Sequence, residues 1–207
     1  MLTVCIDHIV ISVPELDVAQ ESFRTRYGLE VTGGGRHEGV GTENRIIPLD
    51  GSYLELVTVV DAAEAAGNPF GRLVTFGLEQ RVPLTAWVVT GGDTQTAGLS
   101  HQHLRRDGVA VDLYGVDEVV DAGDRPFGLV RPADQAIPGA GAAGGTRLFD
   151  VQVVRPGLAG PVSVTNADAA LPRGIANRGG RLSAVVLEQP DGTRMTLDQH
   201  LLEVISR

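Results

Sequence analysis

The order of predicted elements constrains the fold of this chain more than any other feature. Residues 3–13 have the apolar, β-branched pattern of a buried strand, and residues 15–27 have helical spacing that ends at Gly28. Further strands are predicted over 29–32, 44–49 and 52–60, with a glycine-rich loop over 33–41 and a turn at Asp50-Gly51. The first sixty residues therefore predict a β-α-β-β-β unit.

A second set of elements repeats this order about eighty to ninety residues later. After a connector with weak helical character, the pattern predicts a strand over 84–90, a helix over 94–106, and strands over 109–114, 127–131 and 148–154. Two histidines, His101 and His103, fall in the predicted helix. Their spacing of two residues would place them on different helix faces, so they do not predict a helical metal pair.

The C-terminal part contains a third, shorter echo. Residues 183–191 (SAVVLEQPD) align without a gap on residues 7–15 (DHIVISVPE), and residues 193–206 have a moderately helical pattern that could start as a strand. We therefore expect four segments: a first unit over 1–60, a connector over 61–83, a second unit over 84–160, and a C-terminal strand and helix or truncated third unit over 161–207.

Composition and charge exclude several classes of function. The net charge of −9 argues against a nucleic-acid partner, because phosphate binding needs a basic stripe. All 17 basic residues are arginine, so a Schiff-base lysine and a P-loop lysine are both excluded. The longest apolar runs are too short to cross a membrane, and the N-terminus lacks the basic region of a secretory signal, which predicts a cytoplasmic protein.

Neither the single cysteine nor a glycine-rich motif predicts a cofactor. Because Cys5 is the only cysteine, disulfides within the chain and Cys-rich zinc sites are excluded. We predict that Cys5 is a small buried hydrophobe, with a catalytic thiol as the alternative. Gly139-x-Gly141-x-x-Gly144 has the spacing of a dinucleotide-binding motif. Because no strand precedes it and no helix follows it, we predict a loop and no nucleotide cofactor.

Two residues on predicted strands are candidates for chemistry. His8 lies beside apolar neighbours, where a histidine is either a hydrogen-bonded core residue or a metal ligand. Glu55 is flanked by Leu54 and Leu56, and a buried carboxylate needs a cation or hydrogen-bond donors. A divalent metal such as Zn, Fe, Mn or Ni would supply that charge, and so would an arginine such as Arg45. Both alternatives stay open.

The segment GGGRHEGVGTENR places several polar side chains between glycines. Glycines allow a ligand to approach the backbone closely, and arginines can hold an anionic group. The candidates for substrate binding are Arg36, His37, Asn44 and Arg45. The alternative is an exposed polar hairpin loop.

His8 and Glu55 within a β-α-β-β-β unit, followed by a second such unit, resemble the vicinal-oxygen-chelate superfamily. That superfamily includes glyoxalases, extradiol dioxygenases, methylmalonyl epimerases and bleomycin-resistance proteins. IDHIVISVPELD and GGGRHEGVGTENRIIPLDGSYLELV are most similar to the glyoxalase-like domain proteins. The resemblance implies an α+β fold in which two βαβββ units form a paired, cup-like mixed β-sheet with flanking helices, and it makes a homodimer plausible.

The resemblance also implies a set of metal ligands. His8 and Glu55 would be the ligands of the first unit, and aligning the second unit on the first places Asp150 at the position of Glu55. The same alignment places Ala86 where a histidine is expected, and the C-terminal echo places Ala184 there. The set is incomplete, so three protein groups and waters would hold the metal, or no metal is bound.

The function implied by this resemblance is that of a small-molecule enzyme. A metal-dependent lyase, isomerase or dioxygenase would stabilise an enediolate or oxyanion, and Glu55 would move the proton if burial raises its pKa. The main alternative is a non-catalytic protein that binds a small molecule in the same cup, as resistance proteins do. A structural or regulatory interaction module is the third possibility.

Overall fold

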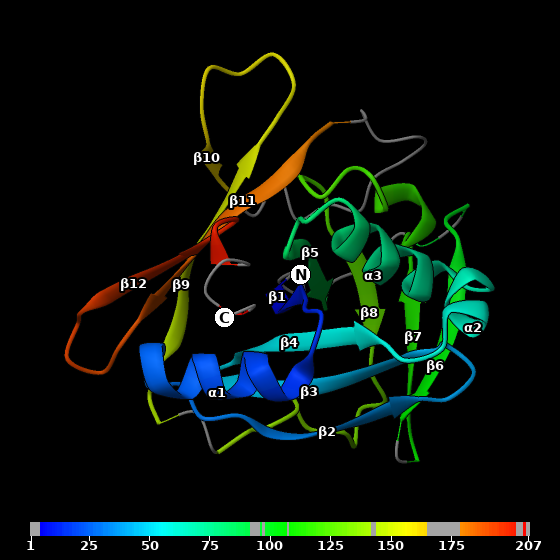
Figure 1. Ribbon diagram of the computed structural model, residues 1–207, viewed down its shortest axis with the longest axis horizontal. Helices are drawn as coiled ribbons and strands as arrows, with labels where there is room; N and C mark the ends of the chain where they lie inside the picture. The colour runs from blue at the N-terminus through cyan, green and yellow to red at the C-terminus, as the bar shows by residue number, and fades with distance from the viewer. Residues whose placement is uncertain are drawn as a thin grey trace.

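The computed structural model describes residues 5–91, 96, 98–106, 108–141, 144–164, 179–201 and 205. Within these residues, an eight-stranded mixed sheet curves into a cup, and a four-stranded sheet lies against it (Figure 1). Few helices accompany the sheets, so the fold is α+β, as predicted. In the described residues, no helix is long and apolar enough to span a membrane.

The first part of the chain has the predicted order of elements. These elements are β1 (Cys5–Ser12), α1 (Leu16–Tyr27), β2 (Thr32–His37), β3 (Thr42–Leu49) and β4 (Ser52–Val59). Gly28 ends α1 in the left-handed conformation, with a φ of 64°, as the sequence predicts. Strand β1 pairs in parallel with β4, which pairs in antiparallel fashion with β3.

Two neighbouring predictions in this part were wrong. Residues 29–31 are not in a strand, although a strand was predicted over 29–32. The segment over 33–41 is largely strand rather than loop, because β2 pairs with β3 from Thr32 to His37. The glycines permit this pairing: a Cβ atom on Gly34, which has a φ of 122°, would lie 2.1 Å from the carbonyl oxygen of Asn44. The glycines that predicted a loop therefore allow a close approach of two strands.

The connector forms two helices, α2 (Ala62–Ala66) and α3 (Pro69–Glu79). Asn68 caps α3 by accepting a hydrogen bond of 2.7 Å from the backbone N–H of Gly71, and Pro69 occupies the first turn. The buried side chains of α3, including Phe70 and Leu73, pack against the inner face of the sheet. This helix therefore closes one end of the cup.

The second part of the eight-stranded sheet contains β5 (Leu84–Thr90), β6 (His101–Arg106), β7 (Val109–Tyr114) and β8 (Phe127–Val130), with a short 3-10 turn, η1 (Asp117–Val119). The predicted helix over 94–106 was wrong over 101–106, because β6 pairs residue by residue with β7. Residues 94, 95 and 97 of that prediction lie outside the described residues. Strand pairing therefore overrides the local helical pattern here.

The strand order is β2-β3-β4-β1-β5-β8-β7-β6, so β1 and β5 lie together at the centre. Strand β5 pairs in parallel with β8, as β1 does with β4, and β1 and β5 are antiparallel to each other. The two edge strands approach each other, since the N–H of Glu38 donates a hydrogen bond of 2.9 Å to the carbonyl of Arg105. This contact nearly closes the cup.

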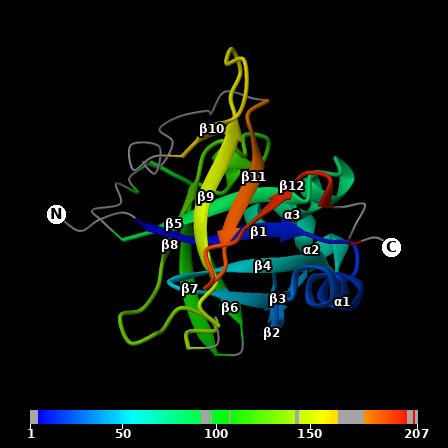
Figure 2. The same ribbon diagram turned by 90° about the vertical axis from the view of Figure 1, so that its left-hand side faces the viewer.

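The smaller sheet contains β9 (Arg147–Val154), β10 (Val162–Ser163), β11 (Arg181–Glu188) and β12 (Arg194–Asp198), in the order β10-β9-β11-β12. It crosses the outer face of the cup (Figure 2). The strand over 148–154 therefore leaves the sheet to which the sequence assigned it. Residues 194–198 are strand rather than helix, and 202–204 and 206–207 lie outside the described residues. The predicted segment boundaries at 60, 84 and 160 stay predictions.

Alternation along β1 separates two cores. Ile9 and Ile11 face outward and pack with α1 and the smaller sheet, whereas Val10 faces inward and packs with α3. Because period-two alternation directs neighbouring side chains to opposite faces, each face of the eight-stranded sheet has its own apolar cluster. The inner face also holds the polar residues described next.

Candidate active site

The inside of the cup holds a cavity of about 260 Å³. Its polar wall comes from the first part of the sheet, with His8 on β1, His37 on β2 and Glu55 on β4. Its apolar wall comes mainly from α3 and the strands β6, β7 and β8: Phe70, Leu104, Val109, Val111, Leu113, Phe127 and Leu129. Arg106, Arg131 and Gln135 also line the cavity from this second part of the chain, so the apolar wall carries a few polar groups.

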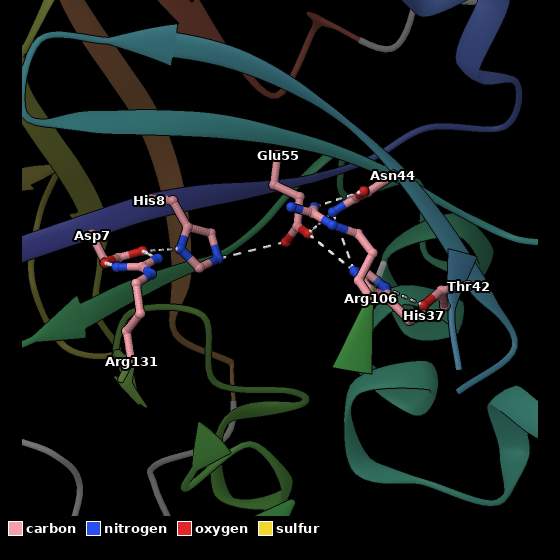
Figure 3. A network of polar contacts seen from close by, with 8 residues as sticks. All are labelled: Asp7, His8, His37, Thr42, Asn44, Glu55, Arg106 and Arg131. Atoms are coloured by element: carbon pink, nitrogen blue, oxygen red, sulfur yellow. Dashed lines mark hydrogen bonds and ion pairs between the residues drawn. The ribbon is translucent and has the colours of Figure 1, made fainter. Parts of the chain in front are cut away.

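His8 is buried between two carboxylates (Figure 3). Its Nδ1 lies 2.8 Å from Oδ1 of Asp7, and its Nε2 lies 3.5 Å from Oε2 of Glu55. The ring also stacks on Tyr53, its partner in the β1–β4 pairing, with centroids 4.4 Å apart. These contacts fix the ring and direct Nε2 toward Glu55.

A β-bulge explains how Asp7 reaches its neighbour. In the pairing of β1 with β5, the register shifts between Ile6 and His8, so Asp7 has no partner residue on β5. Adjacent residues of a regular strand point to opposite faces, whereas Asp7 and His8 form a hydrogen bond. Arg131 holds the other side of Asp7, with nitrogen–oxygen distances of 2.7 and 3.1 Å.

Glu55 is buried, and besides His8 on β1 its partners come from two further strands, β2 and β3. Its Oε1 accepts a hydrogen bond from Nδ2 of Asn44 on β3 and lies 3.6 Å from Nε2 of His37 on β2. The expected alternative partner, Arg45, forms an ion pair of 3.1 Å with Asp17 on α1 instead. An amide and two histidines therefore surround this carboxylate.

The hydrogen bonds of Asn44 assign the orientation of its amide. Its Oδ1 accepts bonds from the N–H of Gly35 at 3.1 Å and from Arg106 at 3.0 Å, so Nδ2 faces Glu55 and His37. Nε2 of His37 then accepts from this amide at 3.2 Å, and Nδ1 donates to Oγ1 of Thr42 at 2.8 Å. This pattern assigns His37 as the neutral tautomer with the proton on Nδ1.

The charges in the site stabilise one another. Burial opposes ionisation of Glu55, but the contact with His8, the charge of that ring and the hydrogen bond from Asn44 outweigh it and lower the pKa of the carboxyl to about 2. Burial likewise opposes protonation of His8, but Asp7 and Glu55 raise its pKa above the ordinary value. The expectation that burial raises the pKa of Glu55 was therefore wrong, because its partners dominate. The pair favours an imidazolium and a carboxylate.

The structure brings together only some of the residues singled out from the sequence. His8, His37, Asn44 and Glu55 belong to one network, which Figure 3 shows from close by. The other three candidates lie elsewhere: Arg36 pairs with Glu64 at 3.0 Å, Arg45 pairs with Asp17, and Asp150 lies on β9 and accepts hydrogen bonds from Ser163 and Gln152. Asp150 belongs to the smaller sheet because its strand leaves the cup.

Three residues of the network were not predicted from the sequence: Asp7, Arg106 and Arg131. Asp7 carries a signal, since a charged residue directly before His8 interrupts an otherwise apolar strand. The place of Arg106 in the site could be predicted only if residues 101–106 were recognised as a strand. Arg131 follows β8, and only the tertiary fold brings it to Asp7, 124 residues away in the chain.

The structure changes the interpretation of His101 and His103. Because β6 is a strand, the spacing of two residues puts His101 and His103 on the same face. Both contact Oδ1 of Asp112 on β7, at 2.9 and 3.2 Å. The prediction that these histidines lie on different faces was therefore wrong. Both side chains are about half exposed, and neither lines the cavity.

The residues present do not fit the expected divalent metal. His8, His37 and Glu55 have the composition of a two-histidine, one-carboxylate iron site. However, the amide nitrogen of Asn44 already donates to Oε1 of Glu55 and to Nε2 of His37, the nitrogen that would have to bind the metal. Among the residues that the structure describes, no group of three His, Cys, Asp or Glu side chains is arranged to hold a metal ion.

Comparisons with solved structures show similar folds at low sequence identity. A hypothetical protein from Staphylococcus aureus is 12% identical, with 94% of this chain and 85% of that chain covered and a TM-score of 0.51. Methylmalonyl-CoA epimerase from Mycobacterium tuberculosis is 15% identical, with 61% and 85% covered and a TM-score of 0.45. A variant of Streptomyces coelicolor methylmalonyl-CoA epimerase, in complex with 2-nitronate-propionyl-CoA, is 20% identical, with 66% and 99% covered and a TM-score of 0.47.

Comparison with protein families is more decisive. No curated protein matches the chain. The model of the glyoxalase-like domain family, however, matches residues 6–197, which include both sheets and the whole polar network. The chain therefore belongs to the glyoxalase-like domain family of the vicinal-oxygen-chelate superfamily.

Proposed function

We propose that this protein is an enzyme that moves a proton next to a carbonyl group of a small molecule, as an isomerase, epimerase or lyase does. The observation that carries this proposal is the buried contact between Nε2 of His8 and Oε2 of Glu55, 3.5 Å apart, on the wall of the cavity. An acid and a base at one cavity wall are the groups that such a reaction needs.

His8 is the general acid in this proposal. Its Nδ1 is hydrogen-bonded to Asp7, which leaves Nε2–H to face the cavity. At 3.5 Å, the contact with Glu55 is longer than a normal N–H···O hydrogen bond of about 2.7–3.2 Å, so a carbonyl oxygen of the substrate can compete for this proton. The imidazolium would stabilise the negative charge that develops on that oxygen.

Glu55 is the base. The C–H bond next to the carbonyl breaks, its proton goes to a carboxylate oxygen of Glu55, and the electron pair forms an enolate whose oxygen receives a hydrogen bond or proton from His8. With a pKa of about 2, Glu55 is a weak base that is ionised at neutral pH. When His8 turns to the substrate, Glu55 loses part of the interaction that lowers its pKa, and its basicity rises.

Exchange with solvent deuterium tests this function without knowledge of the product. Phenylpyruvate and 3-methyl-2-oxobutanoate are incubated with the protein in D₂O, and loss of the C3–H signal is followed by proton NMR. We expect catalysed exchange in the wild type and a loss of about a hundredfold or more in Glu55→Gln and His8→Gln, because general acid–base catalysis contributes about 10²–10⁴-fold. The exposed Glu79→Gln and His200→Gln serve as matched controls.

Two alternative functions would give different experimental results. A protein that binds a small molecule without reaction would bind a probe and leave its C–H signals unchanged in the wild type. A lyase, isomerase or dioxygenase that depends on Zn, Ni, Mn or Fe would copurify with metal and lose it in His8→Ala. We propose the metal-independent reaction because the amide of Asn44 already donates to an oxygen of Glu55 and to Nε2 of His37, two of the three candidate ligands.

A further inference from the structure

The two arginines that line the cavity differ in how their guanidinium groups are used. Arg131 commits both terminal nitrogens to Asp7, and its side chain is 10% exposed. Arg106 donates from one terminal nitrogen to Oδ1 of Asn44, a neutral group. Among the residues that the structure describes, no carboxylate forms an ion pair with Arg106. The remaining N–H groups of Arg106 are therefore suited to an anion in the cavity.

The surroundings of Arg106 limit the class of ligand. Leu104, on the same strand, and Val111 and Leu113, on the neighbouring strand, line the cavity with it. An apolar wall excludes a ligand that is polar throughout, because polar groups buried without hydrogen bonds are costly. The volume of about 260 Å³ lies just below the range of about 300–1,000 Å³ for pockets of drug-sized ligands. The cavity therefore suits a small molecule with one charged end.

The position of Arg106 relates that charged end to the reacting groups. One amide, that of Asn44, accepts from Arg106 and donates to Glu55. An anionic group on Arg106 would therefore lie near the base, next to the carbon that loses its proton. At the same cavity, Oε1 of Gln135 is buried without a hydrogen-bond partner in the described residues, so it can receive an O–H or N–H from the ligand.

We infer that the substrate is a small carboxylate with an apolar body and that Arg106 binds its carboxylate group. Arg106 is then the residue that determines specificity for an acid over a neutral compound. A planar guanidinium matches a carboxylate in a bidentate arrangement, which a lysine cannot reproduce. This inference rests on the proposed function for the identity of the reacting carbon but not for the binding step.

Binding of an unreactive probe pair tests the inference. We would measure the dissociation constants of 3-phenylpropanoate and its neutral analogue 3-phenylpropanamide by calorimetry. We expect the wild type to bind the acid about ten- to a hundredfold more tightly, because hydrogen bonds to charged groups contribute about 1.5–3 kcal/mol. Arg106→Gln should lose this preference and Arg106→Lys should keep part of it. Arg105→Gln, an exposed neighbour on the same strand, should leave it unchanged.

Equal affinity of the wild type for the acid and the amide would overturn the inference, and so would failure to bind either. An unchanged preference in Arg106→Gln would also overturn it. Because neither probe needs to react, the result is separate from that of the exchange experiment. Preferential binding of the acid together with no deuterium exchange would retain the ligand class and reject the proposed reaction.

Discussion

The parallel pairs β1–β4 and β5–β8 occupy corresponding places in the two halves of the sheet and can be compared position by position. In the first pair, His8 lies opposite Tyr53; in the second, Val88 lies opposite Phe127. The backbone arrangement is repeated, but the polar pair is replaced by an apolar one. The first half therefore supplies the candidate reacting groups, and the second half supplies a wall for binding.

The central strands add a second apolar neighbour of His8. The sequence alignment placed Ala86 at the position that corresponds to His8, and in the structure Val88 lies directly opposite His8 across the β1–β5 pair. Both residues are apolar, so neither position supplies the second half with a matching histidine.

The largest loss of stability is expected from a substitution in the second, apolar half of the sheet. Phe127 is fully buried, so Phe127→Ala should lower the free energy of unfolding by about 3–5 kcal/mol. Urea denaturation at neutral pH measures this loss, and the change in stability between pH 6 and pH 3 should match that of the wild type. A loss under about 1 kcal/mol would show that the second half is not packed as described.

The ion pair between Asp7 on β1 and Arg131 after β8 joins the two halves of the sheet, and its removal should cause the next largest loss of stability. Asp7→Asn removes the charge that pairs with Arg131 and should cost about 3 kcal/mol, because it leaves a largely buried guanidinium without its counter-ion. Asp17→Asn is a matched control, since the Asp17 side chain is 90% exposed and its ion pair with Arg45 should contribute at most about 1 kcal/mol. Equal losses in the two variants, measured by urea denaturation, would contradict this account of Asp7.

The polar half should carry a distinct dependence on pH. Because the pKa of Glu55 falls from 4.5 to about 2 on folding, its contribution to stability is present above pH 4.5 and is lost as the pH falls toward 2. That loss amounts to about 3 kcal/mol at 1.36 kcal/mol per unit of pKa. Urea denaturation at pH 6 and pH 3 should show a smaller drop in Glu55→Gln than in the wild type. The same drop in both proteins would reject the low pKa.

The smallest effect is expected outside the cup. Arg36→Gln and Arg45→Gln remove ion pairs with Glu64 and Asp17, and each should change the free energy of unfolding by at most about 1 kcal/mol. Neither should change deuterium exchange by more than about twofold, because neither side chain belongs to the polar network. A large loss of exchange in either variant would show that the substituted arginine contributes to the reaction.

The sequence predicted the part of the site that depends on local pattern. His8 and Glu55 lie in strands with clear apolar patterns, and His37 and Asn44 were singled out as polar residues of a glycine-rich segment. The sequence could not predict that Glu55 prefers Asn44 to Arg45, because that choice depends on the side of β3 that faces the cup. Asp150 lies away from the predicted site for a similar reason. The predicted strand over 148–154 is present, but it pairs with β11 outside the cup.

In the second half, the strand that the sequence did not predict is β6, which lacks a clear apolar alternation. In β6, Leu104 is the one buried residue, so His101–Arg106 resembles a polar helix as much as an edge strand. Arg106 therefore remained outside the predicted site. Pairing with the next strand in the chain, β7, and the contact between the two sheet edges determine its position.

Deuterium exchange after removal of metals tests the central claim most directly. The protein is dialysed against EDTA, its metal content is checked by elemental analysis, and exchange of phenylpyruvate is followed by proton NMR. If His8 and Glu55 act as acid and base, exchange persists in the metal-free wild type and is lost in metal-free Glu55→Gln. Exchange that disappears on dialysis and returns with Zn, Ni, Mn or Fe would contradict the account.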